Sequence, residues 1–171
     1  GGLHLDGLAD SADAWLAGGD KRQSLEIMQD PRCGSGAIIT LTCVLLIKFT
    51  ALSALLSGEQ QWLLILVPLL GRASALLLFL TTPYAREHGL SRDFVEHAPR
   101  PIIRTVLIII TAITGLLMGL QSALLVAVVS ALLIYALRRL MLKRLGGSTG
   151  DTSGALIEII ETGVLVVLSI H

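Results

Sequence analysis

The sequence predicts an all-α protein, a polytopic transmembrane bundle of about five spans preceded by an acidic helix at the cytoplasmic edge of the membrane. Of its 171 residues, 53% are hydrophobic and 15% are charged, far to the apolar side of soluble domains. The apolar residues form long blocks, and basic residues gather in alternate connections between them. We expect one integral membrane domain over residues 1–171, with an acidic segment at 1–35 and the spans at 36–171.

Five blocks are long enough for helices across a hydrocarbon core of about 30 Å, which takes roughly 20 residues. Their approximate ranges are 36–56, 62–82, 102–120, 121–140 and 154–170. Helices are expected because each backbone N–H and C=O in hydrocarbon must be paired within its own segment. The last block is the weakest of the five because it carries two glutamates.

The basic residues indicate which side of the membrane each connection occupies. Ten of the 13 lie before the first block or in the connections at 83–101 and 138–153, whereas those at 57–61 and 119–122 have none. Because Lys and Arg are retained on the cytoplasmic side, we expect a multi-pass protein of the cell (inner) membrane with a cytoplasmic active face. The apolar composition makes the lipid bilayer the expected partner, and a net charge of zero gives no indication of a nucleic-acid partner.

Two basic residues, Lys48 and Arg72, fall near the middle of predicted spans. A charge at this depth is costly and marks either a functional site or an internal partner. For Lys48, a carboxylate on another helix is as good an explanation as function, whereas for Arg72 we favour function. These charges motivate one alternative, a small membrane transporter, although transporters place their ligands near the midplane and most carboxylates here lie at one interface.

Three aspartates near the N-terminus share one face of a predicted helix over residues 5–16. Asp6, Asp10 and Asp13 follow the spacing i, i+4, i+7. Three such carboxylates repel one another unless a cation lies among them. Hard oxygen ligands without cysteine or clustered histidine favour Mg²⁺. A solvated polar face is the alternative, and the spacing alone does not decide between the two.

Further charged and donor-rich groups lie at the same predicted interface. Asp30 and Arg32 come just before the first span, and groups of both signs suit a bound phosphate with its metal. Thr149, Gly150 and Asp151 belong to a glycine-rich loop that opens a helix, a geometry that favours anions. Taken alone, such a loop is more often a plain turn.

Three sequence blocks recur in a known family. They are Gly-Gly-Leu-His-Leu-Asp-Gly-Leu-Ala-Asp at 1–10 with Asp13, Glu-Ile-Met-Gln-Asp-Pro-Arg at 26–32 with Gly34, and Thr-Gly-Asp-Thr at 149–152 with Gly154, Ala155 and Glu158. In content and order they resemble the cobalamin synthase family, adenosylcobinamide-GDP ribazoletransferase. Pro31 and Ser153 depart from the family pattern without removing a carboxylate. Family members begin further upstream, so we expect a chain that lacks its first membrane helices.

The resemblance implies a Mg²⁺-dependent phosphoryl-type transfer late in vitamin B12 assembly. The 3′-hydroxyl of α-ribazole, or of α-ribazole 5′-phosphate, would attack the cobinamide-linked phosphate of adenosylcobinamide-GDP, and GMP would leave. The layout is also similar to CDP-alcohol phosphotransferases, so another alcohol phosphotransferase is a second alternative. Further partners left open are a second copy of the chain and other enzymes of the cobalamin pathway.

The candidate site residues fall into three groups. The predicted metal ligands are Asp6, Asp10, Asp13 and Asp151. The predicted catalytic residues, one of which would accept the hydroxyl proton, are Asp10, Asp13, Asp30 and His4. The predicted substrate contacts are Arg32, Arg72, Thr149, Gly150 and Glu158.

Overall fold

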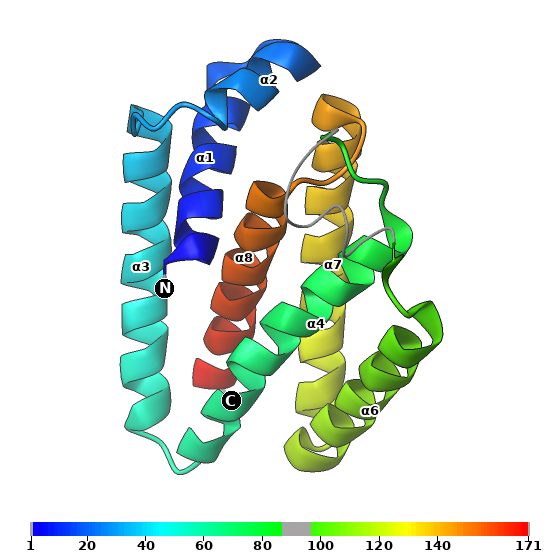
Figure 1. The fold of residues 1–171 in the computed structure, drawn as a ribbon. Coiled ribbons are helices and arrows are strands. Elements are labelled where there is room, and N and C mark those ends of the chain that lie inside the picture. The colour runs from blue at the N-terminus through cyan, green and yellow to red at the C-terminus, as the bar shows by residue number, and fades with distance from the viewer. Residues whose placement is uncertain (1, 87–96, 171) are drawn as a thin grey trace.

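The computed structural model describes residues 2–86 and 97–170 and shows an all-α bundle (Figure 1). In these ranges the α-helices are α1 (Leu3–Ala17), α2 (Lys21–Ile27), α3 (Ser35–Leu56), α4 (Leu66–Thr81), α6 (Arg100–Met118), α7 (Leu120–Leu145) and α8 (Gly150–Ser169), and a 3₁₀ helix, η1 (Gln61–Ile65), leads into α4. Five helical segments are long and apolar enough to cross a membrane: α3, η1 with α4, α6, α7 and α8. The predicted fold class and the number of spans are therefore confirmed.

Helix α8 forms the centre of the bundle. It packs against α1, α3, α4 and α7, and 72% of its most apolar window is buried, against 6% for α7. Its buried side chains Leu156, Ile160 and Val164 belong to the main hydrophobic core. The block that looked weakest by hydropathy is thus the most enclosed span, because its two glutamates face protein rather than lipid.

The connections lie at two opposite ends of the bundle. Helix α2 and the α7–α8 loop are at one end, which we call the acidic end, and the α3–η1 and α6–α7 connections are at the other (Figure 1). The basic residues of α2 and of the end of α7 thus share one end of the molecule. This arrangement matches the predicted alternation of basic and non-basic connections.

Helix α1 is the predicted acidic helix, and it ends at Ala17, just before two glycines. Gly18 and Gly19 both adopt positive φ, 75° and 93°, a conformation that glycine reaches without steric cost. At its other end, α1 crosses α8 closely. A Cβ on Gly7 would lie 2.6 Å from the backbone carbonyl oxygen of Asp151, so only glycine permits this approach.

One predicted boundary was wrong. Helix α7 continues to Leu145, so the basic residues from 138 to 144 lie on its last turns and not in a loop. Two of them bind the carboxyl ends of other helices: Arg144 donates to the carbonyl oxygens of Trp15 (2.7 Å) and Gly19 (3.2 Å). Arg138 donates to the carbonyl oxygen of Thr81 at the end of α4 (2.7 Å). These arginines satisfy helix-end carbonyls that have no partner within their own helix.

Candidate active site

A polar pocket of about 320 Å³ opens at the acidic end, between α1 and the segment that joins α2 to α3. Helix α1 contributes Asp6, Asp10 and Asp13, spaced by whole turns along one face as their spacing predicts. The joining segment contributes Asp30 and Arg32. The structure therefore brings five of the predicted site residues into one pocket, from stretches that are separate in the sequence.

Asp13 fixes the start of the first span. Its two carboxylate oxygens accept hydrogen bonds from the backbone N–H groups of Gly34 (2.7 Å) and Ala37 (2.8 Å), at the N-terminus of α3. A helix N-terminus has unpaired N–H donors and a partial positive charge, both of which a carboxylate satisfies. Asp13 thus joins α1 to α3 while its side chain still lines the pocket.

Asp30 and Arg32 form a local, two-pronged ion pair. The guanidinium of Arg32 donates from Nε at 2.9 Å and from Nη2 at 2.6 Å to the carboxylate of Asp30. Hydrogen bonds from the side chain and the backbone N–H of Arg32 lower the pKa of Asp30 to about 2. With this low pKa, the carboxylate of Asp30 is a poor proton acceptor. Asp30 and Arg32 nevertheless both line the pocket.

Among the aspartates that line the pocket, Asp10 shows a shift opposite to that of Asp30. Burial, together with the charges of Asp6 and Asp151, raises its pKa from 3.8 to about 6, against the opposing charge of Arg86. The carboxyl of Asp10 therefore binds a proton more tightly than an ordinary aspartate does. A base with a pKa near neutrality is suited to accepting a proton from a substrate hydroxyl.

Helix α8 begins with a hydrogen-bonded N-terminal cap. Thr149 is fully buried, and its hydroxyl accepts from the backbone N–H of Thr152 at 3.2 Å, while the Thr149 N–H donates to the Thr152 hydroxyl at 2.8 Å. The two threonines form a reciprocal capping arrangement, and Gly150 is the first helical residue. A loop that opens a helix is thus present as predicted, but Gly150 and Asp151 belong to the helix, and the N–H groups of Thr149 and Thr152 are paired with each other's hydroxyls.

Asp151 follows that cap and meets an arginine that sequence analysis did not single out. The carboxylate Oδ2 of Asp151 lies 2.7 Å from Nη2 of Arg86. Sequence patterns treat Arg86 as one of several loop charges. Tyr84 and Ser148 form an isolated parallel bridge, which brings Arg86 next to Asp151 from a distant part of the chain. Only this tertiary contact identifies the partner of Arg86.

His4 lies away from the pocket. It is about 200° around the helix from Asp6, counting 3.6 residues per turn, and its backbone packs against Gly154 of α8. The structure does not bring His4 to the aspartate stripe.

The two mid-span cations have internal partners. Lys48 Nζ lies 2.5 Å from Glu158 Oε2 and 2.9 Å from Glu161 Oε2, and Arg72 pairs with the other oxygen of Glu161. The alternative given for Lys48, a carboxylate on another helix, is thus what the structure shows. Glu158 is seven residues beyond Asp151, about 10 Å along the axis of α8. The predicted substrate contacts Arg72 and Glu158 therefore belong to an ion-pair cluster deeper in the bundle than the pocket.

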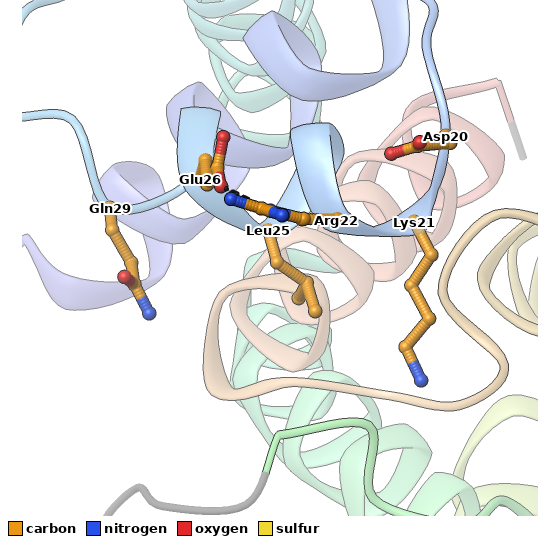
Figure 2. Close-up of a pocket in the computed structure, with 6 residues that line it drawn as sticks. All are labelled: Asp20, Lys21, Arg22, Leu25, Glu26 and Gln29. Carbon is orange, nitrogen blue, oxygen red and sulfur yellow. Dashed lines mark hydrogen bonds and ion pairs between the residues drawn. The ribbon is translucent and has the colours of Figure 1, made fainter.

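A second, more open cavity of about 530 Å³ adjoins the aspartate pocket under α2. Lys21 and Leu25 of α2 and Gln29, just after this helix, extend to the same side, and Arg22 pairs with Glu26 along the helix (Figure 2). Gln29 lines both cavities, so the two are neighbours.

The donor set of the pocket fits a hard divalent cation. Asp6, Asp10 and Asp13 line it and Asp151 lies beside it, all with oxygen donors. The Oδ2 atom of Asp151 is buried and makes no hydrogen bond with the residues that the structure describes. In those same ranges no three His, Cys, Asp or Glu side chains stand ready to hold a metal together. Coordination would thus require these carboxylates to turn toward a common point.

Fold and pocket together define a class: a multi-pass helical membrane protein with an aspartate-lined pocket at one end. Residues 1–169 match the family model of CobS, described as cobalamin-5-phosphate synthase. The chain belongs to this family.

Curated relatives support this assignment. An adenosylcobinamide-GDP ribazoletransferase from Pseudomonas fluorescens is 52% identical over 167 residues, covering 97% of this chain and 68% of its own length. Relatives of the same name from Pseudomonas syringae and Stutzerimonas stutzeri are 50% and 48% identical and are covered over 70% and 69% of their lengths. No solved structure matches the chain.

Proposed function

We propose that this protein transfers the adenosylcobinamide phosphate group of adenosylcobinamide-GDP to α-ribazole, or to its 5′-phosphate, and releases GMP. The family membership and the names of its relatives support the reaction, and the aspartate pocket is the observation that supports its location. The new bond joins the 3′-oxygen of the ribazole to the cobinamide-linked phosphorus. The bond that breaks joins that phosphorus to the oxygen that bridges it to the phosphate of GMP.

Asp10 would accept the proton that the attacking 3′-hydroxyl loses. Among the aspartates that line the pocket, Asp10 is the one whose pKa is raised, to about 6 without a bound metal, because it is partly buried and surrounded by other carboxylates. Asp30 would be a much weaker base because Arg32 holds it ionised. The exposed guanidinium of Arg32 would contact phosphate oxygens at the pocket mouth.

Asp6, Asp13 and Asp151 would hold Mg²⁺, with Asp10 completing the acidic set. When bound, the ion neutralises the negative charge that develops on the pyrophosphate during transfer. The chain itself supplies orientation: Asp13 is fixed by the N-terminus of α3, and Gly7 keeps α1 against Asp151. The adjoining cavity under α2 offers room for part of the second substrate.

The acidic end would face the cytoplasm of a cell with this protein in its inner membrane. The basic residues of α2 and of the end of α7 lie at this end, and such residues remain on the cytoplasmic side during insertion. Adenosylcobinamide-GDP and the ribazole substrate would then reach the pocket from the compartment that contains nucleotides.

Two alternatives lose support. The transporter hypothesis rested on Lys48 and Arg72 at membrane depth, and both are neutralised by glutamates of α8. Another alcohol phosphotransferase would share the aspartate helix, but the curated relatives are cobinamide-GDP enzymes.

The test is release of GMP from adenosylcobinamide-GDP by the purified protein in nanodiscs with α-ribazole and Mg²⁺. We expect Asp10→Asn to reduce the rate by at least about 100-fold, as loss of a general base does. Glu59→Gln removes one carboxylate at the opposite end and should leave the rate unchanged. Wild-type turnover by Asp10→Asn would refute the assignment of Asp10.

A further inference from the structure

Arg86 is an enclosed cation with an unused hydrogen-bond donor. Its side chain is 18% exposed. Its Nε and Nη2 atoms are buried. Nη2 is engaged by Asp151 in an ion pair at 2.7 Å, so Nε is the buried donor that is left without a partner in the described ranges. A buried donor left in this state requires an explanation, and a ligand that accepts from it is one.

The backbone holds Arg86 in place from a distant part of the chain. Ala85 N–H donates to the Ser148 carbonyl and Ser148 N–H donates to the Pro83 carbonyl, both at 2.8 Å. A Cβ on Gly147 would lie 2.4 Å from the Pro83 carbonyl oxygen, so glycine is needed for this approach. The segment before Arg86 is therefore held by backbone hydrogen bonds against the residues that precede α8, which places Arg86 beside Asp151.

The surroundings of Arg86 are more acidic than one guanidinium can neutralise. Asp151 touches it, and Asp10, which feels the charge of Arg86, also feels those of Asp6 and Asp151. Gly7 brings α1 onto the backbone of Asp151, so these carboxylates surround the same end of α8. Arg86 thus competes for Asp151 with any divalent cation that enters.

We propose that Arg86 competes with a divalent cation for Asp151 and, once such a cation takes up the aspartates, donates its N–H groups to the pyrophosphate of the substrate. The identity of that substrate rests on the proposed function, but the exchange itself requires only a divalent cation and a pyrophosphate group. A guanidinium fork matches two phosphate oxygens at once, which a lysine ammonium cannot do.

The proposal predicts opposite effects of one substitution on two ligands. In nanodiscs, Mn²⁺ binding is followed by loss of the free-ion electron paramagnetic resonance signal, and binding of inorganic pyrophosphate in the presence of Mg²⁺ by calorimetry. Arg86→Gln should tighten Mn²⁺ binding by about tenfold, since one adjacent charge shifts the cation affinity of a carboxylate by at least that much. It should weaken pyrophosphate binding by about tenfold.

Arg86→Lys separates charge from shape. It retains the cation, so Mn²⁺ affinity should stay within about threefold of wild type, while the pyrophosphate affinity should still fall because the fork is lost. Arg139→Gln is the matched control, because Arg139 lies on α7 and donates to Tyr135 of its own helix. It should change neither affinity.

The proposal is overturned if Arg86→Gln binds both probes as the wild type does. It is also overturned if Arg86→Gln and Arg86→Lys both weaken Mn²⁺ binding, because Arg86 would then support the loop alone. Helical content and thermal midpoint are measured for each variant. If the ligand shifts occur but no GMP is released, the proposed function fails and the role of Arg86 stands. If GMP is released and the affinities do not shift, the reverse holds.

Discussion

Lys48 on α3 and Glu158 on α8 form an ion pair with 2.5 Å between Nζ and Oε2, inside the part of the bundle that is apolar enough to cross a membrane. Only 9% of the Glu158 side chain and 20% of the Lys48 side chain are exposed. With Glu161 and Arg72 the pair forms a cluster of two cations and two anions, whose formal charges cancel. The cluster connects three spans through the central helix.

Removing Lys48 should strongly destabilise the protein. Lys48→Met leaves Glu158 without its partner at membrane depth, and breaking a buried ion pair from one side costs about 3–5 kcal/mol. The free energy of unfolding is measured by titrating the protein in mixed micelles with SDS. Lys143→Met, at an exposed position near the end of α7, should change it by less than about 0.5 kcal/mol. Equal losses for the two variants would mean that the pair contributes nothing.

Asp13 should be important for stability as well as for chemistry. Asp13→Ala removes both acceptors of the α3 N-terminus, and loss of a helix cap costs about 1–2 kcal/mol. Asp6→Ala is the matched comparison, because Asp6 is an exposed member of the same stripe and should cost less than about 0.5 kcal/mol. Thermal midpoints of the two variants in the presence of a chelator decide the matter. A midpoint for Asp13→Ala no lower than that for Asp6→Ala would contradict the capping role.

The close crossing of α1 and α8 should not tolerate a methyl group. Gly7→Ala places a Cβ 2.6 Å from a backbone oxygen of Asp151, and backbone atoms cannot move aside cheaply. Overpacking of this kind costs about 1–3 kcal/mol and should also lower turnover, because α1 carries the aspartates away from Asp151. Gly115→Ala is the control, since nothing lies within 4 Å of its added Cβ and alanine favours the helix. If both variants keep full activity, the crossing does not position the site.

The sequence predicts those features that depend on local pattern. The spacing of Asp6, Asp10 and Asp13 places them on one helical face whatever the tertiary fold, and the pocket shows them there. The long apolar blocks indicate spans in the same local way, because a helix in hydrocarbon pairs all its backbone N–H and C=O groups within its own segment. These predictions needed no knowledge of which helices touch.

Features that depend on contacts between distant segments could not be predicted. The partner of Arg86 follows from a bridge between Tyr84 and Ser148, which leaves no local pattern. Hydropathy ranked α8 lowest because of Glu158 and Glu161, yet their partners on α3 and α4 make α8 the central span. In each case a tertiary contact decided the role.

Asp10 should make the protein less stable as the pH rises. Its native pKa of about 6 exceeds the ordinary 3.8, so the native state binds the proton more tightly than the unfolded state does. The resulting stabilisation is fully present below about pH 4 and is lost as the pH rises through 6. Asp10→Asn stays neutral at every pH, so its stability relative to wild type should rise between pH 4 and 7 and then level off.

The measurement is the thermal midpoint of both proteins from pH 4 to 8 in a chelator, with Glu59→Gln as a control that removes a carboxylate at the opposite end of the bundle. The control curve should run parallel to wild type. Because the same substitution should stop GMP release, Asp10→Asn is expected to be more stable and yet inactive at pH 7. That combination distinguishes a strained active-site carboxyl from a structural one, whose loss would lower stability and activity together. Parallel curves for Asp10→Asn and wild type would show that Asp10 is not perturbed and would remove the reason for choosing it as the base.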